Sequence, residues 1–262
     1  MTRVITIANQ KGGVGKTTTA VNMAAALAQN NRKCLVIDLD PQGNATTALG
    51  IDHREGTPGI YEVLMGEKTL QEVIRPCADI PGLWGAPATI DLAGAEIELV
   101  SQVAREYRLS KALEQLLAHE EFDYVVLDCP PSLGLLTLNG LVAAREVLLP
   151  IQCEYYALEG LSQLLKSVGM VTEHLNPQLT VSAVILTMYD GRTRLASQVA
   201  DEVRSHFGAT VLETVIPRSV RVSEAPSYGQ TVLTYDPTSS GAIAYREAAE
   251  QLDALTPQQS HK

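Results

Sequence analysis

Short apolar runs, each followed by a stretch of helical pattern, recur along the chain. Several of these runs are apolar almost throughout rather than alternating, which is typical of parallel strands covered on both faces. The expected strands are 3–9, 33–40, 82–86, 124–129, 146–152, 181–188 and 212–216. The expected helices are 17–30, 105–119, 157–174, 195–207 and 241–255. This alternation predicts an α/β fold, a mostly parallel twisted sheet with helices on both faces, in one domain spanning residues 1–262.

Composition limits the class of protein. The chain has 262 residues, of which 45% are hydrophobic and 19% charged, so it can bury a core without disulfides or a structural metal. Its four cysteines lie far apart, as buried thiols in a reducing cytosol do. The apolar stretch at 4–8 is too short for a signal peptide or a membrane span, so we expect a cytoplasmic protein. The net charge of −10, taken alone, argues against nucleic-acid binding.

A glycine-rich loop follows the first expected strand and reads Asn-Gln-Lys-Gly-Gly-Val-Gly-Lys-Thr over 9–17. Glycines let successive backbone N–H groups point at phosphate oxygens, and the helix that follows adds the positive end of its dipole. Lys16 supplies charge to the β- and γ-phosphates, and the Thr17 hydroxyl is placed to ligate Mg²⁺. A chance glycine-rich turn is the alternative, which the strand before and the helix after disfavour. The predicted nucleotide-binding residues are Lys11, Gly12, Gly13, Val14, Gly15, Lys16, Thr17 and Thr18.

Carboxylates stand at the ends of two further expected strands. Asp38 and Asp40 share a face because strand side chains alternate. Either could instead cap the helical segment expected near Asn44. Asp128 ends an apolar strand beside the loop, the position of a Walker B residue that holds Mg²⁺ through water. After it, Gly134 gives a switch segment the freedom to re-orient with the γ-phosphate.

The loop departs from the ordinary P-loop pattern in two places. Gln10 stands where the first glycine is expected, and an extra lysine, Lys11, stands at the mouth. This form resembles the deviant Walker A of the ParA, MinD, nitrogenase-reductase and arsenite-pump ATPases. Further segments resemble the Soj-type ParA proteins, and together they cover nearly the whole chain. They are 38–45, 92–99, 128–134, 152–160, 215–218 and 223–226.

The resemblance implies a P-loop ATPase that binds ATP and Mg²⁺ and hydrolyses ATP slowly. It makes Lys11, Lys16 and Asp40 the catalytic residues: Lys11 reaches across an ATP-dependent sandwich dimer, and Asp40 positions the attacking water. Asp38 joins Thr17 and Asp128 near the magnesium. The resemblance also places the adenine near Met188 and Pro217.

The resemblance further implies binding to the backbone of non-specific double-stranded DNA. By position the contacts fall on Arg192 and Arg221, with Arg194 and Arg218 as further candidates. Residues 186–221 carry five arginines and four acids, a net charge of +1 that leaves −11 for the rest. A polarised surface would therefore reconcile DNA with an acidic chain. In isolation each arginine reads as a solvated or ion-paired side chain.

The family also implies a ParB-like partner, which triggers hydrolysis and release from the nucleoid. Because the first expected strand begins at residue 3, we expect no N-terminal helix-turn-helix domain, and acids in the C-terminal segment argue against membrane targeting. Nitrogenase reductase fits poorly, because no second cysteine joins Cys129 in a glycine-rich setting. A cargo-positioning ATPase that does not bind DNA remains the alternative. A small-molecule kinase is disfavoured by Lys11.

Overall fold

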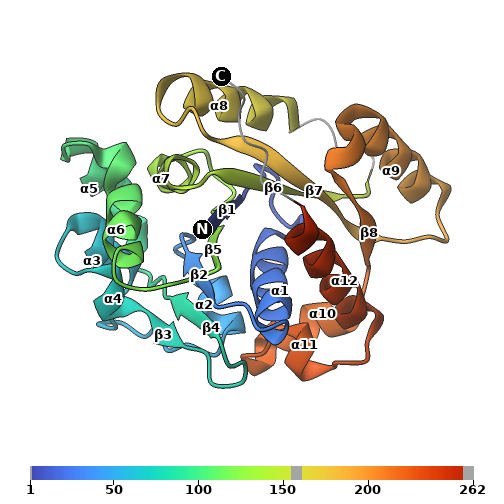
Figure 1. Ribbon diagram of the computed structural model, residues 1–262, viewed down its shortest axis with the longest axis horizontal. Helices are drawn as coiled ribbons and strands as arrows, with labels where there is room; N and C mark the ends of the chain where they lie inside the picture. Colours follow the sequence, from blue (N-terminus) through green and yellow to red (C-terminus); the bar gives the residue numbers. More distant parts are fainter. Residues whose placement is uncertain (1, 155–160, 256–262) are drawn as a thin grey trace.

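The computed structural model describes residues 2–154 and 161–255. Their strands form one sheet in the order β3-β4-β2-β5-β1-β6-β7-β8 (Figure 1). The strands are β1 (Arg3–Ile7), β2 (Cys34–Asp38), β3 (Arg75–Pro76), β4 (Leu83–Ala86), β5 (Tyr124–Asp128), β6 (Glu146–Gln152), β7 (Thr180–Tyr189) and β8 (Val211–Pro217). All pairings are parallel except that of β3 with β4. The predicted fold class is confirmed, and β3 was missed because two residues carry no periodic pattern.

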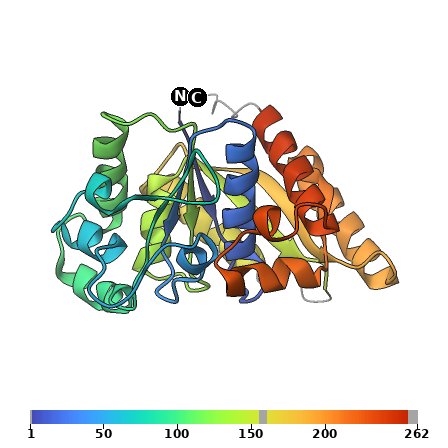
Figure 2. The ribbon, with the colours of Figure 1, turned by 90° about the horizontal axis from the view of Figure 1, so that it is seen from below.

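Helices cover both faces of the sheet, each over its own apolar core. One face carries α1, α2, α11 and α12, and the other carries α3 to α9 (Figure 1). Figure 2 views the molecule from the side of α1 and α12, which pack against each other. The helices are α1 (Lys16–Gln29), α2 (Asn44–Ala48), α3 (Ile60–Met65), α4 (Leu70–Val73), α5 (Leu92–Glu98), α6 (Arg108–Leu117), α7 (Leu135–Ala143), α8 (Leu161–His174), α9 (Arg194–Phe207), α10 (Val220–Glu224), α11 (Val232–Tyr235) and α12 (Ser240–Ala254).

The five predicted helices correspond to α1, α6, α8, α9 and α12. Residues 157–160 of the third, and 256–262 at the C-terminal end, lie outside the described residues. Of the helices missed, α7 matters most, because it follows the predicted switch segment. It is apolar nearly all round and mostly buried, so it shows no helical period. None of the described helices is both long and apolar enough to cross a membrane.

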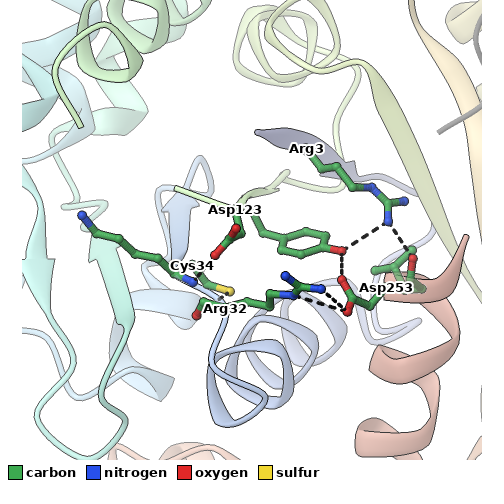
Figure 3. Close-up of polar contacts among 8 residues, drawn as sticks. Arg3, Arg32, Cys34, Asp123 and Asp253 are labelled. Atoms are coloured by element: carbon green, nitrogen blue, oxygen red, sulfur yellow. Dashed lines mark hydrogen bonds and ion pairs between the residues drawn. The ribbon is translucent and has the colours of Figure 1, made fainter. Parts of the chain in front are cut away.

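A hydrogen-bonded network joins the strands at their amino ends to α12 (Figure 3). Arg3 donates two hydrogen bonds to the carboxylate of Glu146, at 2.9 and 2.7 Å. The Tyr124 hydroxyl donates to Asp253 at 2.5 Å, and Arg32 pairs with the same carboxylate at 2.8 Å. Each charge in this network has a partner of opposite sign, so this end of the sheet is closed by its own side chains.

Candidate nucleotide and magnesium site

The glycine-rich loop lies between β1 and α1, at the carboxyl end of the sheet. Asn9 fixes its start: its side-chain amide donates to the Pro150 carbonyl at 2.8 Å and accepts from the Lys11 backbone N–H at 3.0 Å. Gly13 and Gly15 adopt left-handed φ values of 73° and 87°. A Cβ added at Gly13 would meet no atom within 4 Å, so the loop borders open space. Its backbone therefore leaves room for a ligand at the N-terminus of α1.

Lys16 opens α1 and folds back over the loop. Its ammonium donates to the Lys11 carbonyl oxygen at 3.1 Å, and the residue is only 7% exposed. Burial lowers the pKa of Lys16, while the nearby charges of Asp128 and Asp40 oppose that shift. A buried ammonium bonded to a neutral carbonyl attracts an anion, as a phosphate-binding lysine should.

Asp128 ends β5 and lies between β1 and β2, with Ile7 and Asp38 as its neighbours in register. Within the described residues, neither of its buried carboxylate oxygens has a hydrogen-bond partner. Burial raises the pKa of Asp128 well above its ordinary value, and the charge of Asp38 adds to this. The nearby Thr17 hydroxyl acts to lower the pKa of Asp128, although it does not meet the geometry of a hydrogen bond to either carboxylate oxygen. A buried carboxylate without partners normally receives a cation or ordered water.

This donor set fits Mg²⁺ held mainly by phosphate and water. In the part of the chain that the structure describes, no three His, Cys, Asp or Glu side chains gather in a way that would hold a metal by themselves. Mg²⁺ usually keeps several waters and takes only one or two protein ligands beside substrate phosphates. Asp128 and Thr17 suit that mode.

Asp38 is engaged differently from Asp128. One of its oxygens accepts hydrogen bonds from the Thr46 backbone N–H at 2.9 Å and hydroxyl at 2.7 Å, and the other accepts from the Asp40 N–H at 3.1 Å. Asp38 therefore satisfies a backbone N–H in the first turn of α2, close to the capping use expected for these aspartates, although the N-cap residue is Gly43. Burial raises the pKa of Asp38 to about 6 despite these donors. Its predicted place near magnesium stays a prediction, and sequence reasoning missed Thr46 because nothing local marks it.

Asp40 stands at the mouth of the site rather than inside it. It is partly exposed, and one carboxylate oxygen accepts a hydrogen bond from the Gln42 N–H at 3.0 Å. Its negative charge acts to raise the pKa of both Lys16 and Asp128. An exposed carboxylate in this position has access to water, and its predicted role in positioning the attacking water is retained as a prediction.

The ends of β7 and β8 border the same loop. Thr187, which sequence reasoning missed, donates from its hydroxyl to the Val14 carbonyl at 2.8 Å. Met188 follows with a φ of 50°, which is strained for a side chain of its size, and its methyl lies 4.0 Å from where a Cβ on Gly15 would stand. Pro217 lies beside this strand end through the β7–β8 register. The structure thus places Met188 beside the loop, with Pro217 paired to the next residue of β7.

The four predicted DNA-binding arginines lie on exposed segments after β7 and β8. Arg192 pairs with Asp190 at 2.8 Å, Arg218 with Glu154 at 3.0 Å, and Arg221 with both Glu224 and Asp236 at 3.1 and 3.3 Å. Arg194 begins α9 with its side chain exposed. Three of the four are therefore held in ion pairs, which the net charge of residues 186–221 does not reveal.

These features define a P-loop ATPase, and comparisons with known proteins give its family. A family model described as "AAA domain" matches residues 2–181. The chain is 52% identical to the chromosome partitioning protein ParA of Myxococcus xanthus over 250 residues, covering 95% of this chain and 87% of that protein. It is 50% identical to the sporulation initiation inhibitor protein Soj of Bacillus subtilis over 254 residues, covering 97% and 99%.

A solved structure, cobyrinic acid a,c-diamide synthase from Mycobacterium smegmatis with a bound ATP analogue and magnesium, is also similar. It shares 39% identity and a TM-score of 0.84 over the whole of both chains. The chain belongs to the ParA/Soj family of chromosome-partitioning ATPases. The predicted fold, family and ATPase class are confirmed, while the roles of individual site residues remain predictions.

Proposed function

We propose that this partitioning ATPase works as a nucleotide-gated switch for binding DNA. The observation that carries the proposal is the contrast at its site: a loop bordering open space lies beside a buried lysine and a buried aspartate without hydrogen-bond partners. ATP with Mg²⁺ supplies the opposite charges that both side chains need. The family and the ligands bound in the similar M. smegmatis structure support the same pair.

The residues divide the work of ATP hydrolysis by position. Loop N–H groups and Lys16 hold the phosphates, and Thr17 and Asp128 hold the magnesium, Asp128 through water. The metal neutralises charge that develops on the phosphates. Asp40, with access to solvent, orients the attacking water. Lys11 reaches the nucleotide of a second subunit, so that ATP joins two copies into a dimer.

DNA binding follows from the four arginines 192, 194, 218 and 221. Contacts from guanidinium groups to phosphates are independent of sequence and sensitive to salt. One subunit offers few such contacts, and a dimer presents twice as many on one body. ATP-driven dimerisation therefore controls DNA retention, and a ParB-like centromere-binding protein triggers hydrolysis and release. The protein accordingly acts in the cytoplasm, on the nucleoid.

The activity named for the M. smegmatis protein ranks behind partitioning. Its sequence is 39% identical to this chain, against 52% and 50% for the two partitioning relatives over nearly the full length. Partitioning also requires contacts to DNA, which the exposed arginines after β7 and β8 provide.

Retention on random-sequence duplex DNA tests the proposal. The protein is measured with ATP, ADP or no nucleotide, each at low and high salt, with Lys16→Ala as the variant that cannot engage ATP. We expect retention only with ATP and at low salt, and none for the variant. Absence of retention in every state would remove DNA from the account and favour a cargo-positioning ATPase of the same family.

A further inference from the structure

Two acids stand at the same strand ends as the predicted DNA-binding arginines. Asp190 follows β7 and Glu154 follows β6, whereas Arg192 and Arg218 follow β7 and β8. The Arg218 backbone N–H donates to the carbonyl of Tyr189 at 3.1 Å, which holds the segment after β8 against the end of β7. Acids and arginines are therefore fixed beside one another by the sheet itself.

Asp190 is bound more completely than an ordinary surface acid. The Arg192 guanidinium donates to its two oxygens at 2.9 and 2.8 Å, and the Arg192 backbone N–H donates at 3.1 Å. Arg192 lowers the pKa of Asp190 to about 2, and Arg218 contributes to this shift. Asp190 thus lies within the electrostatic reach of both arginines, while Arg218 donates a hydrogen bond to Glu154 at 3.0 Å.

A carboxylate and a phosphate bind a guanidinium in the same way, through two parallel N–H···O bonds. The fork of Arg192 that would hold a DNA phosphate is already filled by Asp190. The side chain of Arg192 is 88% exposed, so DNA has access to it, but the pair must open before a phosphate can take both bonds.

We propose that Asp190 limits the DNA affinity of this face by competing with phosphate for Arg192, with Glu154 doing the same at Arg218. The inference rests on the proposed DNA binding, and it adds two residues, Asp190 and Glu154, that weaken this binding. The cluster of two acids and two arginines carries no net charge, so one subunit attracts DNA weakly. A weak single contact keeps the bound state dependent on the dimer and easily reversed.

The test is a double-mutant cycle on Asp190 and Arg192, read as the dissociation constant for random duplex DNA with ATP. Asp190→Asn keeps an oxygen to accept the Arg192 N–H, so the turn is preserved while the charge is removed. Glu202→Gln removes an exposed acid from α9 and is the matched control for net charge. Glu154→Gln, in cycle with Arg218→Gln, is an independent second variant, and melting temperatures confirm folding of each protein.

We expect Asp190→Asn to bind DNA about threefold more tightly, the scale of an exposed ion pair, and Glu202→Gln to stay within about 1.5-fold of the parent. Arg192→Gln should bind more weakly, and adding Asp190→Asn to it should change nothing further. Glu154→Gln should likewise tighten binding only while Arg218 is present.

Two results would overturn the inference: no tightening, or equal tightening with and without Arg192, which is a bulk-charge effect. If the parent protein retains no DNA with ATP, the proposed function fails separately. In that case the inference stands only if Asp190→Asn creates retention that requires Arg192.

Discussion

The two ends of the central sheet treat buried charge in opposite ways. At the amino end, Arg3 and Glu146 are both largely buried and bind each other through two hydrogen bonds. At the carboxyl end, Asp128 is fully buried without a hydrogen-bond partner among the described residues, and Lys16 bonds only a carbonyl oxygen. Burying an unpaired charge costs far more than burying a paired one. The first end is complete in itself, and the second is arranged for a ligand.

The buried charges that lack partners, and so destabilise the nucleotide-free protein, lie at the carboxyl ends of the strands. The carboxyl ends of parallel strands are where α/β proteins bind ligands. Here two buried groups at that end, Asp128 without a hydrogen-bond partner and Lys16 with only a carbonyl oxygen, are the ones that bound phosphate and magnesium are proposed to satisfy. Removing the charge of Arg3 should therefore destabilise the amino end, whereas removing the charge of Asp128 should stabilise the carboxyl end.

The largest expected effect on stability is at the amino end. Arg3→Met leaves the Glu146 carboxylate buried without its ion pair, and should lower the free energy of unfolding by about 3–5 kcal/mol, measured by urea denaturation. Arg54→Met is the control, because the pair of Arg54 with Asp52 is exposed and should leave the midpoint unchanged. Equal midpoints for the two variants would show that the network does not hold this end together.

The next effect is on activity. Lys16→Ala removes the positive charge at the loop and should reduce ATP hydrolysis by roughly 10²–10³-fold, the usual cost of losing one group that stabilises developing charge. Lys68→Ala, at a partly exposed lysine paired with Glu72, serves as the control in the same phosphate-release assay. Activity within about tenfold of the parent would mean that Lys16 does not stabilise charge on the reacting phosphates.

Asp128→Asn should produce a smaller change, in the opposite direction from Arg3→Met. It replaces a buried charge by a neutral group of the same shape, and should stabilise the nucleotide-free protein by about 1–2 kcal/mol, a few degrees in melting temperature. Hydrolysis should be lost at the same time. Asp38→Asn is the informative partner, since Asp38 accepts three hydrogen bonds and its loss should destabilise. A fall in stability for both would contradict the contrast.

Sequence alone predicted the parts of the molecule that are encoded locally. The phosphate loop is one continuous segment between a strand and a helix, and the strands are short apolar runs, so pattern and spacing were sufficient. Asp128 was found for the same reason, as a carboxylate that ends such a run.

The remaining features depend on residues far apart in the chain. The hydrogen bonds that Asp38 accepts from Thr46 in α2 depend on the chain turning back, and the pair of Glu154 with Arg218 spans 64 positions. The buried helix α7 lacks a helical period because both its sides are covered. Tertiary packing decides each of these, and no local pattern reports it.

The most direct test of the account is the melting temperature of the parent and Asp128→Asn proteins with ATP, in the presence of Mg²⁺ or of a chelator. If the unpaired oxygens of Asp128 are the place for magnesium, Mg²⁺ should add to the stabilisation by ATP in the parent and add little in the variant. ATP alone should stabilise both. If Mg²⁺ raised the melting temperature of Asp128→Asn with ATP as much as that of the parent, the assignment would be contradicted. Thr17 and Asp38 would then be the remaining candidate ligands.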